Sequence, residues 1–187
     1  MDINYIHNWI KHRLNEERYL HSLGAEETAR ELAVQFSVDV EKAALAALIH
    51  DNAKCIPYED VLQIIKENNF SIDENIKSNK KVVHAYLGAL LAEKELNIKD
   101  EDVLNAVRFH TTGRPNMTML EKVVFLADKI EANTRELDFR EEVLNILNKT
   151  GNIDEAVMLC IGRTIHSLVD RKLMINPITI EVWNYYL

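Results

Sequence analysis

Apolar residues recur along most of the chain at intervals of three and four positions, which is the spacing of one face of an α-helix. Within 21–38, for example, four apolar residues stand at positions i, i+3, i+4 and i+7: Ala29, Leu32, Ala33 and Phe36. The same pattern predicts further helices over 40–49, 58–68, 81–96, 100–109, 139–149 and 153–173. Thr118, with Glu121 three positions later, has the pattern of a capping box and predicts the start of another helix.

The segments between these predicted helices carry few signals for β-strands. No Asn-Gly or Asp-Gly pair separates two runs of alternating hydrophobicity. The polar stretch 66–81 is typical of a helix end followed by an exposed loop, and Asn176-Pro177 is expected to end the last long helix. We therefore predict an all-α fold, a compact bundle of seven to nine helices in one domain over 1–187, with 175–187 as a C-terminal tail.

The composition agrees with this fold class. Five Gly and three Pro in 187 residues are too few turn formers for a β-sandwich, barrel or propeller. A chain of this size buries about 70% of its unfolded surface, so it does not need disulfides for stability. Cys55 and Cys160 lack the spacing of a metal or redox motif, and we expect both to be reduced thiols, buried or half-buried, in a cytoplasmic protein.

The charge balance excludes some classes of partner. With 22 basic and 30 acidic residues, the net charge is −8, which argues against a protein that tracks along nucleic acid. The longest apolar run, 43–49, is far shorter than the roughly 20 residues of a membrane span, and the N-terminus has no pattern of a secretory signal. A small anionic ligand remains compatible, because bound metal ions can invert the sign of a local site.

Several polar residues stand at positions where the pattern predicts burial. His50 and Asp51 directly follow the apolar run 43–49, and a carboxylate there is costly to desolvate alone. Three more residues lie at the edge or end of an apolar helix: His84, His110 and Asp128. A fourth, His21, precedes a predicted helix start. Each alone is explained by a hydrogen-bonded structural His or an ion-paired Asp, but a shared metal centre would explain all of them together.

The other histidines are expected to have no part in this site. His7 and His12 fall in a polar N-terminal helix, where we expect exposure to solvent. His166 lies in the middle of a predicted helix among apolar residues, and we expect it at the edge of the core.

Five segments resemble, in the same order, the HD-domain superfamily of metal-dependent phosphohydrolases. They are RYLHS (18–22), LIHDNAK (48–54), VVHAYLGA (82–89), FHTTG (109–113) and FLADKIEANTR (125–135). Within that superfamily they are similar to the YqeK family of symmetrical bis(5'-nucleosyl)-tetraphosphatases. The resemblance covers nearly the whole chain and implies a helical HD-domain bundle.

The resemblance also implies roles for individual residues. A first metal ion would be held by His21, His50, Asp51 and Asp128. His84 and His110 would supply a second position, with Asp51 as the bridge, and would also contact substrate.

Further residues are implied to contact the substrate. Lys54 would point at a phosphate and take part in catalysis with Asp51, and two arginines would bind polyphosphate: Arg135 and Arg18. Three consecutive residues would approach a phosphate or nucleoside through a hydroxyl or backbone N–H: Thr111, Thr112 and Gly113.

Plainer explanations exist for some of these residues. Lys54 could form a surface salt bridge with Asp51 at i+3, and Gly113 could serve only a turn. Arg18 could be an exposed partner of either of two acidic residues, Glu17 or Glu26.

The expected reaction is hydrolysis of diadenosine tetraphosphate to two ADP by a metal-bound hydroxide that attacks an inner phosphorus. Lys54 and Arg135 would stabilise the phosphoryl oxygens. A mixed N and O ligand set without thiolate suits iron or manganese better than magnesium. The resemblance implies iron, divalent or trivalent, with manganese, nickel or cobalt as alternatives and one or two ions bound. The alternatives are another HD-type nucleotide phosphatase or phosphodiesterase, or a nucleotide-binding regulatory protein without turnover.

The expected partners are small nucleotides: a dinucleoside polyphosphate, and ADP or GDP as product-like ligands. The C-terminal tail supports two expectations about assembly. It could form a homodimer through its apolar and aromatic end, or fold back on its own core, with the same residues involved: Trp183, Tyr185, Tyr186 and Leu187.

Overall fold

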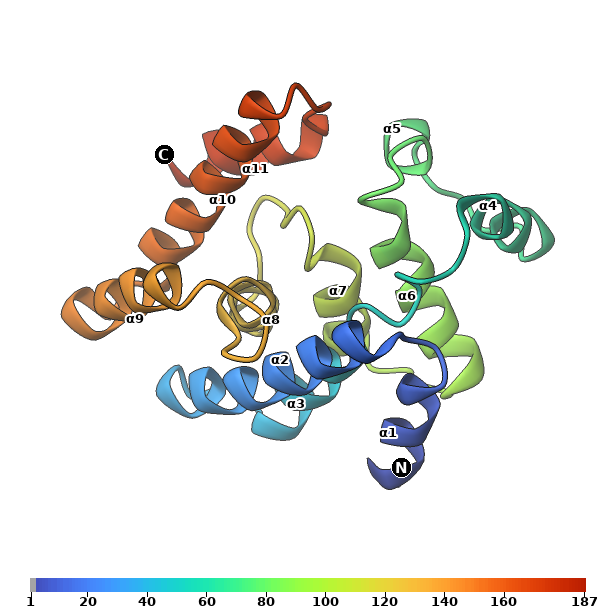
Figure 1. Cartoon of the computed structure of the whole chain (residues 1–187), viewed down its shortest axis with the longest axis horizontal. Helices are drawn as coiled ribbons and strands as arrows, with labels where there is room; N and C mark the ends of the chain where they lie inside the picture. Colours follow the sequence, from blue (N-terminus) through green and yellow to red (C-terminus); the bar gives the residue numbers. More distant parts are fainter. Residues whose placement is uncertain (1–2) are drawn as a thin grey trace.

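The computed structural model describes residues 3–187, which form eleven helices and no strand. This confirms the all-α prediction. In chain order the helices are α1 (Ile3–Lys11), α2 (Glu16–Gln35), α3 (Val40–Ile49), α4 (Tyr58–Glu67), α5 (Glu74–Lys77), α6 (Val83–Glu95), α7 (Glu101–Phe109), α8 (Met119–Ile130), α9 (Leu137–Thr150), α10 (Ile153–Asp170) and α11 (Pro177–Tyr186). Figure 1 shows α4 to α6 on one side of α8 and α9 to α11 on the other.

Most helices begin at a side chain that accepts a hydrogen bond from the first turn. The capping residues are Asn15, Asp39, Asp73, Asp100, Thr118, Asn152 and Asn176. Such caps satisfy backbone N–H groups that have no partner within the helix. The capping box predicted at Thr118 forms only in part. Thr118 accepts from the N–H of Glu121, but the Glu121 carboxylate binds Arg114 instead of reaching back.

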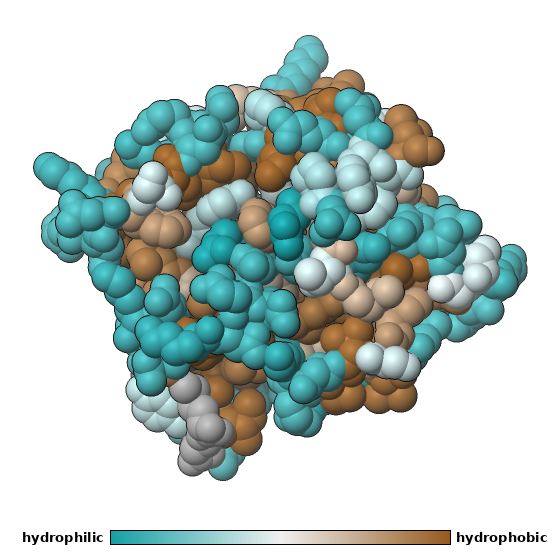
Figure 2. Space-filling model, turned by 180° about the vertical axis from the view of Figure 1, so that it is seen from behind, coloured by the Kyte–Doolittle hydropathy of each residue, from teal (hydrophilic) through white to brown (hydrophobic). Residues whose placement is uncertain are grey.

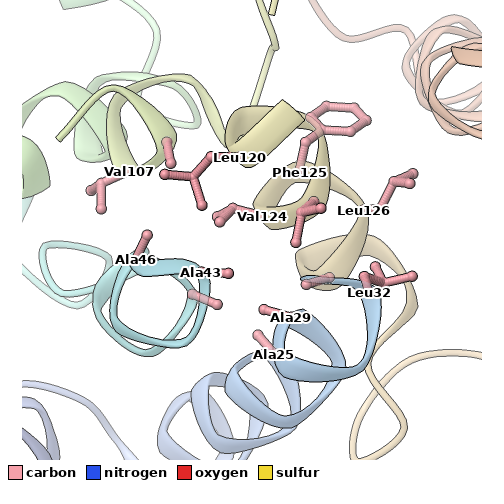
Figure 3. Packing of buried hydrophobic residues seen from close by; sticks show 14 of the residues in the cluster. Ala25, Ala29, Leu32, Ala43, Ala46, Val107, Leu120, Val124, Phe125 and Leu126 are labelled. Carbon is pink, nitrogen blue, oxygen red and sulfur yellow. The ribbon is translucent and has the colours of Figure 1, made fainter. Parts of the chain in front are cut away.

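The main core forms where α2, α3, α7 and α8 pack against one another. Small residues occupy the contact between α2 and α3, whereas α8 contributes larger ones (Figure 3). Three alanines of that contact are fully buried, Ala25, Ala29 and Ala43, whereas Ala46 of α3 points toward Val107 of α7. Short side chains let two helix backbones approach closely, so the ends of α2 and α3 come together with little freedom.

A second apolar cluster joins α4 to α6. Asn52 connects this side of the molecule to the main core, because its amide donates to the carbonyl oxygens of Ile49 (2.8 Å) and Gly88 (3.0 Å). Both acceptors are backbone groups at buried positions, so the bonds hold the end of α3 against the middle of α6.

The structure differs from the sequence-based expectations at several elements. There are eleven helices among the described residues rather than seven to nine, because α5 lies inside the polar stretch 66–81 and α11 lies inside the tail. Ile76 of α5 is buried, so that stretch is not only an exposed loop. His21 does not precede a helix start but lies inside α2, which Asn15 caps one and a half turns earlier.

The C-terminal tail folds back on the core of its own chain. Val182 is fully buried, and the hydroxyl of Tyr186 accepts a hydrogen bond from the backbone N–H of Met117 at 3.1 Å. Tyr185 and Leu187 remain exposed. The homodimer expected through this segment therefore stays a prediction. The other expectation, that the tail folds back on its own core, describes its packing.

The remaining expectations have mixed outcomes. His12 is exposed, and His7 is half-buried next to Glu26. His166 is exposed rather than at the core edge, because it points outward from α10. Cys160 is buried, and Cys55 is exposed rather than half-buried. None of the helices within residues 3–187 is both long and apolar enough to cross a lipid bilayer.

The alanine contact between α2 and α3 can be tested by overpacking. Ala29→Leu should lower the free energy of unfolding by about 2–3 kcal/mol, because Ala29 is fully buried between helices that cannot separate without loss of packing. The measurement is urea unfolding followed by circular dichroism. Val34→Leu on the same helix, where Val34 is 70% exposed, should change the free energy of unfolding by less than about 0.5 kcal/mol. Equal stability of the two variants would contradict this account of the packing.

Candidate metal centre

Six side chains from five helices or their ends meet in the interior. His21 lies in α2, His50 and Asp51 follow α3, and His110 follows α7. His84 lies at the start of α6, and Asp128 lies near the end of α8. All six are at most 6% exposed. The structure thus brings together the complete set of ligand-type residues that the sequence singled out.

Two of the histidines are oriented by the same local motif. His50 and His110 each follow directly after the last residue of a helix. Their Nδ1–H groups donate to the backbone carbonyl oxygens three residues earlier, Ala47 at 2.6 Å and Val107 at 2.7 Å. In a neutral ring this leaves the lone pair on Nε2, and in both residues Nε2 faces the centre.

A first group of ligand atoms surrounds His21. Its Nε2 lies 3.1 Å from His50 Nε2 and 3.1 Å from Asp128 Oδ1. Asp51 Oδ2 stands 3.7 Å from His50 Nε2 and 4.0 Å from His21 Nε2. Two nitrogen or oxygen atoms that share a metal ion at about 2.1 Å are separated by about 3.0–3.4 Å when the ligand angle is near 90–110°. The separations of this group are close to that range.

A second group lies on the other side of Asp51. The Oδ1 atom of Asp51 is 3.1 Å from His84 Nε2 and 3.4 Å from His110 Nε2, and these two nitrogens are 3.2 Å apart. The two oxygens of one carboxylate therefore face different groups. Asp51 is the residue that both groups share.

The protonation states at the centre favour a cation. Burial lowers the pKa of His50 to about 3 and that of His84 to about 4, so both rings are neutral at physiological pH. Although burial opposes its ionisation, the pKa of Asp51 lies well below its usual range because imidazoles and Lys54 surround it. Asp51 Oδ1 accepts no hydrogen bond from the described residues. Imidazole nitrogens and carboxylate oxygens, which are all hydrogen-bond acceptors, thus face one another in a buried site. Such an arrangement fits one or two divalent metal ions.

Four basic side chains border the two carboxylates. Lys54 Nζ lies 3.6 Å from Asp51 Oδ1 and 3.1 Å from His84 Nε2, and partial burial lowers its pKa. An Arg18 guanidinium nitrogen is 3.4 Å from Asp51 Oδ2. Arg18 therefore points inward, whereas Glu26 pairs with His7 and Arg30.

Asp128 carries the other two cations. Lys129 Nζ is 2.5 Å from its Oδ2, and Arg135 donates to its Oδ1 at 2.7 Å and to its backbone carbonyl at 2.8 Å. Burial opposes the ionisation of Asp128, but Lys129, His21 and Arg135 hold its pKa well below the usual range. Burial opposes the charge of Arg135, but three carboxylates, Asp128, Glu131 and Asp51, together raise its pKa.

The three residues after His110 occupy different environments. Thr111 Oγ1 lies 3.0 Å from His110 Nε2 and 3.4 Å from His84 Nε2, so it reaches the centre. The hydroxyl of Thr112 donates to the Gly113 carbonyl, and the Gly113 N–H donates to Phe109 O at 2.8 Å. Gly113 has φ +68°, which matches the turn explanation, and the structure does not bring it to the ligand cluster.

Sequence reasoning missed a buried carboxylate behind His21. Glu131 is fully buried at the end of α8, and its Oε1 lies 3.0 Å from His21 Nδ1. Glu131 also accepts from the backbone N–H groups of Asn133 (2.6 Å) and Thr134 (3.1 Å). A carboxylate on the outer nitrogen of a metal-binding histidine fixes its tautomer and raises its basicity. The available signal was that Glu131 stands three positions after Asp128, on the same helix face.

Glycine in α2 makes room for this carboxylate. A Cβ at Gly24 would overlap the Glu131 Oε2 atom and lie within 2.9 Å of the Asn133 amide. The close approach of α2 to the end of α8 therefore requires glycine at this position.

Comparisons with known proteins point to one family. The HD domain matches residues 18–133. The symmetrical bis(5'-nucleosyl)-tetraphosphatase of Bacillus subtilis is 38% identical over 94% of this chain and 92% of its own length. The protein of the same name from Halalkalibacterium halodurans is 40% identical over 95% and 93%. A crystal structure of a predicted HD superfamily hydrolase involved in NAD metabolism, from Clostridium acetobutylicum, superposes with a TM-score of 0.92 and 36% identity, covering 100% of this chain and 97% of that one.

Glu131 offers a test of the first ligand group. Glu131→Gln should weaken metal binding at that group about 10–100-fold, because an amide cannot accept all the N–H groups around it and no longer balances His21. Metal content after dialysis at limiting metal, measured by mass spectrometry, gives the readout. Glu141→Gln, an exposed change on α9, is the matched control. Metal binding equal to that of the control would show that Glu131 does not support His21.

Proposed function

This chain belongs to the HD-domain family, and on that premise we propose that it is a symmetrical bis(5'-nucleosyl)-tetraphosphatase. Its reaction would add one water across the central P–O–P bond of diadenosine tetraphosphate and release two ADP. The observation that carries this proposal is the shared carboxylate of Asp51, whose two oxygens face two buried groups of imidazole ligands. That arrangement suits a phosphoanhydride, which needs positive charge on both sides of the bond that breaks.

The residues present fit two metal positions. His21, His50, Asp51 and Asp128 would hold the first ion, and Asp51 would share a second with His84 and His110. Ions bound there would draw charge from the phosphoryl oxygens and lower the pKa of a water molecule toward neutrality. The mixed nitrogen and oxygen donors favour iron, with manganese, nickel or cobalt as alternatives.

The chain itself supplies the charge that binds the phosphates. Around Asp51 and Asp128 stand Lys54, Arg18, Lys129 and Arg135, so four positive charges face two negative ones. With the neighbouring carboxylate of Glu131 counted, a local excess of +1 remains on a chain of net charge −8, and it attracts a polyphosphate to this one place. Lys54 and Arg135 would donate to phosphoryl oxygens next to the bond that breaks, and the hydroxyl of Thr111 would donate to a neighbouring one.

A cavity beside Thr111 offers space for one nucleoside. It has a volume of about 280 Å³ and lies between the start of α6, α10 and the start of α11. Apolar side chains and hydroxyls line it together, among them Val82, Leu168, Met174 and Thr112. Such a mixture suits a ribose and a flat base. ADP or GDP would bind there as a product-like ligand.

The products of diadenosine tetraphosphate test the proposed reaction. Metal-loaded protein should release ADP as the sole nucleotide product, because the proposed reaction adds one water across the central P–O–P bond. Ion-exchange separation after a timed incubation provides the readout. ATP plus AMP would show asymmetric cleavage, and no product despite nucleotide binding would favour a regulatory protein without turnover. Faster release of phosphate from a mononucleotide would favour another nucleotide phosphatase.

Asp51 provides the test of the paired metal positions. Asp51→Ala should lose both ions and reduce hydrolysis at least 1000-fold, since each group loses one of its carboxylate oxygens. Elemental analysis of the purified variant measures the metal, and circular dichroism checks the fold. Asp138→Ala on the exposed start of α9 is the control. Full metal content in Asp51→Ala would rule out the bridging role.

A further inference from the structure

A groove lined by four basic side chains lies beside the metal centre. It runs between α10 and the segment that connects α8 to α9, and has a volume of about 380 Å³. We call it the α10 groove and define it by Lys129, Arg135, Glu136, Phe139, Arg163 and Arg171. Figure 1 shows α10 extending past the α8–α9 connection, and the helices α8, α9 and α10 contact one another. The reverse side of the molecule, in Figure 2, is largely covered by polar residues interrupted by scattered apolar ones.

The ion pairs of the fold account for all but one of the cations in the α10 groove. Lys129 and Arg135 share the carboxylate of Asp128, and Arg163 pairs with Glu136. The side chain of Arg171 is exposed and makes no hydrogen bond or ion pair with the described part of the chain. Arg171 thus has no acidic partner in the described part of the chain, and Lys129 and Arg135 share one carboxylate, so an anion in the groove would stabilise these three cations.

The α10 groove is continuous with the metal centre. Lys129 and Arg135 line the groove and also contact the carboxylate of Asp128. The nucleoside cavity also reaches the metal centre, because Thr111 lines it and reaches His110. The two cavities are neighbours that share Thr164 and Leu168, and each one contains a residue that contacts a side chain of the metal centre.

We propose that the α10 groove binds the second nucleoside diphosphate arm of a dinucleoside tetraphosphate. This inference rests on the proposed function. A substrate that is the same from both ends and is cut in its middle needs space for one nucleoside diphosphate on each side of the cut. Lys129 and Arg135 hold the phosphate next to the metal centre, and Arg171 holds the next one.

One part of the α10 groove suits a nucleobase. The Arg163 guanidinium stacks there on the buried ring of Phe139, at 4.0 Å from the ring centre, and its outer face is left for a base. Aromatic and guanidinium planes are common stacking partners of bases. The groove volume also lies within the usual range of about 300–1,000 Å³ for small-molecule sites.

Substitution of Glu136 removes a negative charge from the same groove, whereas substitution of an arginine removes a positive one. The Glu136 carboxylate lines the groove and forms an ion pair with Arg163. In the absence of this negative charge, Arg163 is free to contact the ligand. Removal of an arginine and removal of this glutamate should therefore shift nucleotide binding in opposite directions, which loss of folding cannot produce.

Equilibrium dialysis with radiolabelled ADP tests the proposal on protein loaded with manganese. The wild type should bind two ADP per chain, one in each cavity. Arg163→Gln/Arg171→Gln should bind one ADP at unchanged affinity and the second at least tenfold more weakly. Glu136→Gln should bind the second ADP about threefold more tightly. Lys149→Gln, an exposed neutralisation roughly 15 Å along α9 from Phe139, should match the wild type.

The outcomes separate this inference from the proposed function. One ADP per wild-type chain, or two ADP with equal affinity in the double arginine variant and the wild type, would overturn the assignment of the α10 groove. Two ADP with the expected variant effects, but no cleavage of diadenosine tetraphosphate, would support the groove and refute the proposed reaction. Cleavage to ADP with a single ADP site would support the reaction alone.

Discussion

The whole structure depends on bringing hydrogen-bond acceptors together where water is excluded. The Nε2 atoms of two neutral imidazoles, His50 and His84, stand 3.1–3.7 Å from the carboxylate oxygens of Asp51 at the centre of an apolar bundle. Acceptors of this kind repel one another, and each buried polar group without a partner costs several kcal/mol. Packing of the surrounding helices must offset that cost until cations arrive. Metal binding and folding of this chain are therefore thermodynamically linked.

The fold meets this cost with small residues and with helix ends. Alanines between α2 and α3 and the glycine at position 24 permit close approach, which brings ligands from separate helices to one point. His50 and His110 are held by the carbonyl groups that end their helices, and Glu131 holds His21 from behind. Because these three imidazole rings are already held in place, little conformational entropy is lost when a metal ion binds. The precise position of each ligand atom matters more for the chemistry than the number of ligand atoms.

A strongly acidic protein can accept a strongly acidic substrate because charge acts locally. Screening limits surface charges to a range of about 8–10 Å in physiological salt, so distant acidic residues contribute little at the site. Near the two buried carboxylates the basic side chains prevail, and the excess of positive charge continues along α10.

The sequence by itself determined the helical class, most helix positions and the six residues that meet at the centre. These follow from local signals, because the 3.6-residue period, caps and polar residues at buried positions are written in consecutive residues. Only the tertiary structure decided that Glu131 supports His21, that Gly113 serves a turn, that the tail packs as α11 and that four cations line one groove. Each of those depends on contacts between residues far apart in the chain, such as the 110 positions that separate His21 from Glu131. The direction of a side chain across such a distance is set by how whole helices pack, and no local pattern records it.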